Sequence, residues 1–146
     1  MKIVIDTNIL MSCLLNPYST IGNLLLHELT THTKFAPYFL FVEIFDKKEK
    51  IIKHSRMNER ELLELLFIVL REIEFVNVSQ ISDTSLSKAR ELVQGIDEDD
   101  TEFVALAIET DALLLTGDKK LYKGLKERGF EDVINVSELQ EMLKIE

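Results

Sequence analysis

The chain has 146 residues, of which 46% are hydrophobic and 29% are charged, and its net charge is −9. This length and composition predict one ordered globular domain over residues 1–146 and exclude a disordered or low-complexity chain. The acidic balance argues against nucleic-acid binding over a broad electropositive surface, so any phosphate contact must be local. Cys13 is the only cysteine, which excludes an intrachain disulfide and a thiolate zinc site.

An apolar, β-branched run at residues 2–5 predicts a strand buried on both faces, as in a parallel sheet covered by helices. The strand begins directly after Met1 and no apolar run approaches the roughly 18 residues of a membrane span, so we expect no signal peptide, no membrane segment and a cytoplasmic location. The strand leads into Asp6. In open parallel sheets ligands bind at the carboxyl ends of strands, which makes Asp6 the first candidate functional residue. By itself it is equally explained as a residue that ends the strand or caps the next helix.

The next elements continue an alternation of helices and strands. Residues 18–31 carry apolar side chains at helical spacing and predict one amphipathic helix. A short second strand is predicted at 34–38, and the pattern becomes helical again from about Leu40.

That helix carries Glu43 near its start, on the same face as Lys47, Lys50 and His54. With the usual right-handed crossover, Glu43 lies at the same end of the sheet as Asp6. A solvated glutamate in the first turn is also favoured by the helix dipole alone.

Residues 62–70 predict a helix that is apolar around most of its circumference, with Asn58 and Glu61 as a capping pair before it. Such a helix must be buried on more than one side, either by the following helix or by another chain. We therefore expect dimerisation through a helical hairpin at residues 58–94.

A third strand is predicted at 74–78 and a further helix at 84–93, ended by Gly95. The next helix opens with four consecutive acids, residues 97–100. One or two acids in a first turn are favoured by the helix dipole, but four need another explanation.

A fourth buried strand at 112–116 is followed by Asp118, which repeats the arrangement of Asp6 and could equally cap the helix predicted at 119–127. A fifth strand is predicted at 133–136. The closing helix is expected to start with a capping box of Ser137 and Gln140.

This alternation predicts a three-layer α/β/α domain with a central parallel five-stranded sheet. Its carboxyl edge then gathers four acids, Asp6, Glu43, Asp100 and Asp118. Two carboxylates about 5 Å apart repel by roughly 3 kcal/mol at an effective dielectric of about 20, so such a cluster must be neutralised. A hard divalent cation with oxygen ligands does this, and Mg²⁺ or Mn²⁺ suits the donor set better than Zn²⁺. Such a cation activates water and offsets charge on a phosphodiester, which indicates hydrolysis of a nucleic-acid backbone.

Four pieces of the chain carry a family resemblance in their order and spacing: Ile3 to Leu10, Glu43, Asp100 with the following Phe103 to Ala107, and Leu115 to Leu121. They resemble the PIN domain and, within it, the VapC-like toxins of bacterial and archaeal toxin–antitoxin systems. The resemblance covers essentially the whole chain. It implies a ribonuclease selective for single-stranded RNA and dependent on Mg²⁺ or Mn²⁺. The family members are usually homodimers, often silenced by a small antitoxin protein whose tail enters the acidic cleft.

By position, the family's four acids are matched by Asp6, Glu43, Asp100 and Asp118. Its supporting polar positions are matched by Thr7, Asn8 and Thr116. Asp97 and Asp99 compete with Asp100 for the third acid, and Asp46 and Glu49 compete with Glu43 for the second. Phosphate contacts are expected from cations that flank the cleft, mainly Lys47, Lys50, Lys119 and Lys120, although ordinary solvated helix faces explain these lysines equally.

Two other functions are consistent with part of the pattern. A Mg²⁺-dependent phosphatase of the haloacid-dehalogenase type needs a second Asp two residues after the first, and this chain has Asn8 at that position. A phosphoacceptor receiver domain needs an Asp at the end of the third strand, and this chain has Asn77 and Ser79 there. A non-catalytic PIN-like module that binds RNA or protein would be expected to have lost one of the acids.

Overall fold

The computed structural model describes residues 1–145 and is built around one sheet. Its strands are β1 (Lys2–Ile5), β2 (Thr33–Pro37), β3 (Ile73–Val76), β4 (Leu113–Leu115) and β5 (Val133–Ile134). All neighbouring strands are parallel, in the order β3-β2-β1-β4-β5. The predicted three-layer α/β/α architecture with a parallel five-stranded sheet is confirmed.

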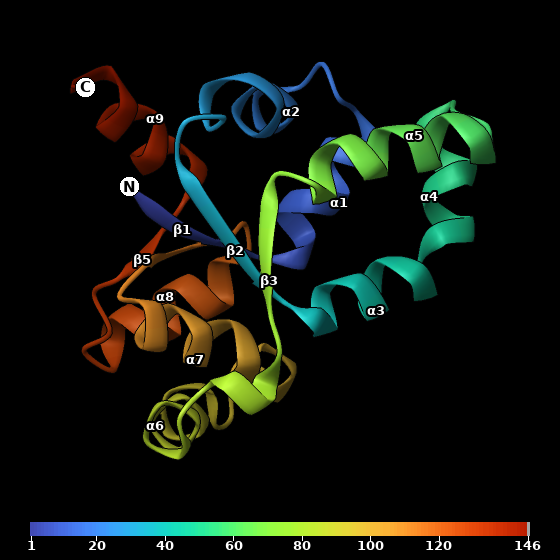
Figure 1. Ribbon diagram of the computed structural model, residues 1–146. Coiled ribbons are helices and arrows are strands. Elements are labelled where there is room, and N and C mark those ends of the chain that lie inside the picture. The colour runs from blue at the N-terminus through green and yellow to red at the C-terminus, as the bar shows by residue number, and fades with distance from the viewer. Residues whose placement is uncertain (146) are drawn as a thin grey trace.

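The helices cover both faces of the sheet (Figure 1). The connections from β1 to β3 supply α1 (Thr7–Leu15), α2 (Thr20–Asn23), the π-helical turn η1 (Leu24–Glu28), α3 (Tyr38–Asp46), α4 (Lys48–Ser55) and α5 (Glu59–Leu70). The later connections supply the 3₁₀ turns η2 (Val78–Gln80) and η3 (Glu98–Asp100) with α6 (Asp83–Val93), α7 (Thr101–Thr110) and α8 (Lys119–Glu127), and the helix α9 (Val136–Ile145) follows β5. In Figure 1, α1, α4 and α5 lie on one side of the sheet and α6, α7 and α8 on the other.

The central strand β1 is buried on both faces, as its apolar run predicts. Ile3, Val4 and Ile5 are completely inaccessible to solvent. The helix α7 packs against β1, β2 and β4, and small residues such as Ala105 let it lie close to the sheet. This central position of β1 fixes where its carboxyl end, and therefore Asp6, lies.

Two predicted helices are each divided in the structure. The expected helix at 18–31 is α2 followed by η1, and it ends early because the buried Lys34 donates from Nζ to the carbonyl oxygen of Leu29 at 2.6 Å. The expected helix from Leu40 begins at Tyr38 and breaks at Lys47, so Glu43 lies on α3 whereas Lys50 lies on α4. The single face predicted for Glu43, Lys47, Lys50 and His54 is therefore wrong. The break turns α4 so that Ile51 is buried against the core.

The helical hairpin predicted at 58–94 is also wrong, because β3 lies between its two helices. α5 packs on α1, whereas α6 packs on α7 and α8 across the sheet (Figure 1). Of the predicted caps, the pair Asn58 and Glu61 is confirmed with bonds of 3.1 and 2.8 Å. At α9 the capping pair is instead Asn135 and Glu138, since the helix starts earlier than the sequence pattern indicated.

Within residues 1–145, no single helix has the length and apolar character needed to cross a membrane, and one sharply bent pair, Thr7–Leu15 with Thr20–Glu28, meets those criteria only when its parts are combined.

Candidate functional site

The predicted acids come from four different segments and lie at the carboxyl edge of the sheet. Asp6 follows β1 and caps α1, and Asp118 follows β4 closely and caps α8. Glu43 lies in α3, which directly follows β2. Asp100 is the last residue of η3 and immediately precedes α7. Since β1 has β2 and β4 as its neighbours, the parallel sheet brings these segments together.

Thr116 links the two acids that follow β1 and β4. Its hydroxyl donates to Asp6 Oδ2 at 2.6 Å and accepts the backbone N–H of Asp118 at 3.0 Å. Thr116 and Asp6 are only 1% and 4% exposed, so this connection lies in the interior. Asp6 also accepts the backbone N–H of Asn8 at 3.3 Å, which holds the carboxylate at the first turn of α1.

Glu43 is held by Thr7, the residue that follows Asp6 at the start of α1. The hydroxyl of Thr7, a buried residue, donates to Glu43 Oε1 at 2.6 Å. Asp46 and Glu49, the alternatives that the sequence left open, are exposed, and Glu49 lies 3.9 Å from Lys48. Thus Glu43, next to Asp6, is the acid that α3 contributes.

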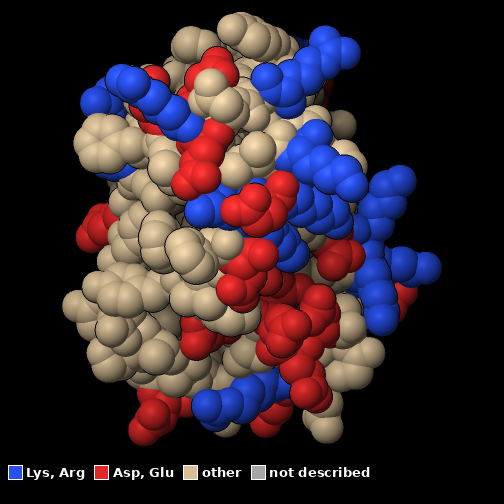
Figure 2. All heavy atoms as spheres, turned by 90° about the vertical axis from the view of Figure 1, so that its right-hand side faces the viewer, with Lys and Arg blue, Asp and Glu red and all other residues tan. Residues whose placement is uncertain are grey.

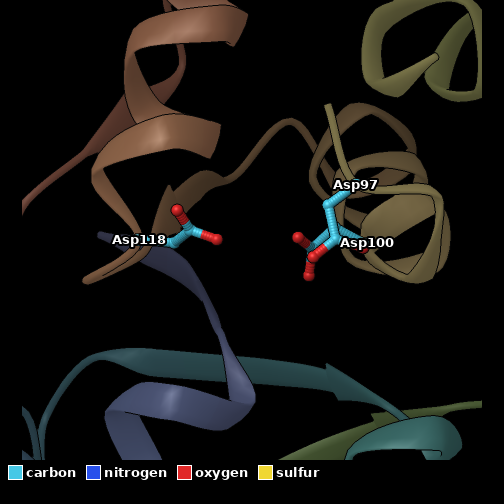
Figure 3. A group of neighbouring side chains, drawn as sticks. All are labelled: Asp97, Asp100 and Asp118. Carbon is cyan, nitrogen blue, oxygen red and sulfur yellow. The ribbon is translucent and has the colours of Figure 1, made fainter. Parts of the chain in front are cut away.

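Three carboxylates face one another across the centre of the site (Figure 3). Asp97 caps the start of η3, Asp100 ends it and Asp118 caps α8, and one carboxylate oxygen of each lies within 4.8 Å of the others. Asp97 also accepts the backbone N–H of Asp99 at 3.0 Å, which shapes the turn. Both Asp97 and Asp100 thus belong to the cluster, whereas the sequence left open which of them was the third acid.

The pKa values show that these acids act on one another. The pKa of Asp100 is raised from its ordinary value of 3.8 to about 8, mainly by burial and in addition by the negative charges of Asp6, Asp97, Asp118 and Glu43. Burial also raises the pKa of Asp6, against the lowering effect of the Thr116 hydrogen bond. The site therefore stores negative charge that its own hydrogen bonds do not fully offset.

Burial likewise raises the pKa of Glu43, while Thr7 and Lys47 lower it. The negative charges of Asp6 and Asp99 add to the increase. Asp99 therefore lies within electrostatic range of Glu43, although it is not one of the three acids whose oxygens converge.

The donor set fits a hard divalent cation. All of the converging atoms are carboxylate oxygens, and Cys13 is buried in α1. Oxygens bonded to one Mg²⁺ ion at about 2.0–2.1 Å lie roughly 3–4 Å apart, so these three carboxylates, whose oxygens lie within 4.8 Å of one another, would have to move closer together to hold one. Asp97, Asp100 and Asp118 are the side chains that would hold such an ion, and Asp6 lies close enough to raise the pKa of Asp100.

Positive side chains border the acids. Lys47 is half-buried and lowers the pKa of Glu43, so it lies at the site. Lys119 and Lys120 are exposed at the start of α8 beside Asp118, and Lys50 is exposed on α4. On the face shown in Figure 2, the acidic side chains gather in one area, and Lys and Arg side chains border it. Lys47 lies at the break between α3 and α4 and Lys50 follows it in α4, whereas Lys119 and Lys120 begin α8.

Sequence reasoning did not identify the cavity beside this cluster. Tyr122, Asn135 and Ser137 line it together with Asp118. In the sequence these residues look like ordinary parts of helices and a turn, and nothing in their spacing brings them together.

Comparison with known proteins gives matches along most of the chain. The sequence model of the PIN domain family matches residues 4–141. An uncharacterized protein of Methanocaldococcus jannaschii, MJ1680, is 32% identical over 142 residues, which is 92% of this chain and 82% of that protein.

Two solved structures share the fold. The crystal structure of VapBC2 from Rickettsia felis, bound to a DNA fragment of its promoter, contains a chain that matches with a TM-score of 0.66 and 19% identity, covering 92% of this chain and 98% of that one. The crystal structure of PAE2754 from Pyrobaculum aerophilum matches with a TM-score of 0.69 and 15% identity, covering 100% of this chain and 97% of that one.

Proposed function

Because this chain belongs to the PIN domain family, we propose that it is a divalent-metal-dependent ribonuclease that cleaves single-stranded RNA. The observation that carries the proposal is the convergence of Asp97, Asp100 and Asp118, with Asp6 and Glu43 beside them, at one edge of the sheet. Such a concentration of carboxylates is costly in a protein unless a cation or a proton neutralises it.

In this proposal each polar group has a defined task. The metal ligands are Asp97, Asp100 and Asp118, with Asp6 behind them. A bound Mg²⁺ or Mn²⁺ lowers the pKa of a coordinated water and offsets charge on the phosphodiester during in-line attack. Glu43, held by Thr7, is assigned to accept a proton from the attacking water.

Neighbouring groups position these acids and the substrate. Thr116 keeps the side chain of Asp6 and the backbone of Asp118 in register, and Asn8 holds Asp6 through its backbone. The phosphates on either side of the scissile bond are assigned to two pairs of lysines, Lys47 with Lys50 and Lys119 with Lys120.

The test is incubation of the purified protein with labelled single-stranded RNA, with and without Mn²⁺, and with the Asp6→Asn variant as the control. We expect cleavage only by the natural protein and only with metal. Equal cleavage by Asp6→Asn, or equal cleavage in EDTA, contradicts the assignment. A non-catalytic RNA-binding PIN module is the second candidate; it predicts binding of the same RNA without cleavage under both conditions.

We further propose a role as the toxin of a toxin–antitoxin pair, with a small antitoxin protein as partner. The support is the family likeness and the shared fold with a chain of the VapBC2 crystal structure. If this is correct, expression of the chain arrests growth of its host, and co-expression of a small protein encoded immediately upstream relieves the arrest.

We assign the predicted homodimer to the exposed face of α5 alone, the first of the two helices that the expected hairpin at 58–94 contains. An open apolar patch lies along one face of α5, formed by the exposed Leu63, Phe67 and Ile68, with Arg60 and Glu64 at its rim. Phe67 is 65% exposed, which is costly for a side chain of this size in a monomer. We propose a second copy of the chain as the occupant, because a two-fold arrangement of α5 places cationic and anionic rim residues of one copy opposite those of the other.

A further inference from the structure

A cavity of about 300 Å³ lies at the carboxyl ends of β4 and β5, directly beside the acidic cluster. Asp118 belongs to both sites, because it lines the cavity and its carboxylate faces Asp97 and Asp100 (Figure 3). The other walls come from the start of α8 and the turn into α9, including Gly117, Lys119, Tyr122, Asn135 and Ser137. A ligand in this cavity would therefore sit next to the bond that the cluster is proposed to cleave.

The size and chemistry of the cavity suit one nucleoside. Its volume is at the lower end of the about 300–1,000 Å³ that small-molecule sites occupy. Tyr122 offers an aromatic ring, Ser137 a hydroxyl group, and Asn135 an amide whose oxygen already accepts the N–H of Glu138. Proteins recognise unpaired bases with aromatic rings and with donors and acceptors of this kind, and Lys119 adds a cation for an adjoining phosphate.

A second cavity, of about 290 Å³, borders the acids on the opposite side of the sheet edge. Val78 and Arg90 line it together with three acids, Glu98, Asp99 and Glu102. Three carboxylates against one guanidinium disfavour a phosphate-bearing ligand. The cavity at β4 and β5, with one acid that belongs to the metal cluster and one lysine, is the better site by charge.

We propose that the cavity at β4 and β5 binds the nucleoside adjoining the scissile phosphodiester and thereby sets the base preference of the nuclease. The statement about base preference rests on the proposed nuclease function, whereas binding of a nucleoside depends on the cavity alone. The expected ligand is thus a single unpaired ribonucleoside, read through its base.

The test compares Ser137→Trp, which fills the cavity from an exposed position, with Val78→Trp, which places the same side chain in the second cavity. Both positions are exposed, so both variants should fold. The natural chain has no tryptophan, so each variant carries a single indole. Its fluorescence follows unfolding, and the two variants should unfold at the same denaturant concentration.

Binding is measured first, without metal, by adding adenosine, guanosine, cytidine or uridine at millimolar concentration and following the backbone amide resonances. In the natural protein and in Val78→Trp, at least one of these uncharged nucleosides should shift the resonances of Gly117 and residue 137. In Ser137→Trp, none of the four should shift the resonances of Gly117 and the other residues that line the cavity. If none of the four shifts them, or if Ser137→Trp binds as well as the natural protein, the cavity is not a nucleoside site.

Cleavage of RNA with randomised sequence is measured second, with Mn²⁺. Ser137→Trp should lose base preference at one position beside the cleaved bond by at least about fivefold, while Val78→Trp keeps it. A preference that changes in Val78→Trp instead overturns the assignment. Absence of cleavage by the natural protein refutes the nuclease function, and the binding measurement then still decides whether the cavity takes a nucleoside.

Discussion

Without divalent metal, the stability of this protein should fall as the pH rises from about 4 to about 8, because of Asp100. The pKa of this carboxyl is raised from 3.8 to about 8 in the folded chain, so the folded state binds a proton that the unfolded state has released over this range. Stability decreases with pH wherever the folded state binds more protons than the unfolded state. The direction is opposite to that of acid denaturation, which carboxylates with lowered pKa values produce.

The size of this effect follows from the two pKa values. A difference of one pKa unit is worth about 1.4 kcal/mol. If Asp100 were shielded from solvent, the shift from 3.8 to about 8 would therefore lower the free energy of unfolding by roughly 5–6 kcal/mol at high pH. Asp100 is only half-buried, and screening by water reduces such interactions strongly. We therefore expect a loss of roughly 2–3 kcal/mol between pH 5 and pH 8.5.

The matched change is Asp100→Asn, which keeps the size of the side chain and removes its charge. The metal-free variant should be more stable than the natural protein at pH 8 and similar to it at pH 5. Urea unfolding at a series of pH values in EDTA measures both proteins. Added Mg²⁺ should stabilise the natural protein most at high pH, because the cation replaces the proton, and should stabilise Asp100→Asn much less.

A metal-free natural protein whose stability rises or stays level between pH 5 and pH 8 would refute this reasoning. So would an Asp100→Asn variant that is less stable than the natural protein at pH 8. Either result would mean that the carboxylates do not repel one another strongly. The electrostatic argument that a cation must neutralise them would then fail.

Three further results are expected from single substitutions. Asp118→Asn should abolish cleavage in the RNA assay and cost little stability by urea unfolding, because the amide oxygen can still accept the N–H groups at the start of α8. Thr116→Val should destabilise the fold by roughly 1–3 kcal/mol and slow cleavage at least about tenfold, since it removes the hydroxyl between Asp6 and Asp118. Phe67→Glu should yield a monomer by light scattering at micromolar concentration, whereas a natural protein that is itself monomeric there would contradict the dimer.

The sequence was sufficient for a parallel five-stranded sheet with β1 buried inside it, and for the acids that follow β1 and β4. Residues 2–5 are apolar on both faces, and such a run has few stable places other than the centre of a parallel sheet. Asp6 and Asp118 follow from this, because Asp6 comes directly after β1 and Asp118 is the third residue after β4. Glu43 was the weakest assignment in sequence, and its contact with Thr7 depends on the exact start of α3 at Tyr38.

The sequence could not give the features that depend on long-range packing. The break at Lys47 has no proline or glycine to mark it, and it arises because Ile51 on α4 packs into the core. The early end of η1 depends on Lys34, a residue that would ordinarily be placed in solvent but is 3% exposed. The opposite placement of α5 and α6 results from the reversal of strand order after β3, which no local pattern encodes.

The acids of the site differ in how firmly the fold holds them, and this has a consequence for metal binding. Asp6 and Asp118 are joined through Thr116 and through adjacent strands, so their positions are set before any ion binds. Asp100 instead ends the three-residue turn η3 and Asp97 caps its start, and the shape of this turn depends on the hydrogen bond that Asp97 accepts from the N–H of Asp99. The approach of the carboxylates that a cation requires is therefore expected at Asp97 and Asp100, since moving Asp118 would also disturb the cap of α8 and the central strands.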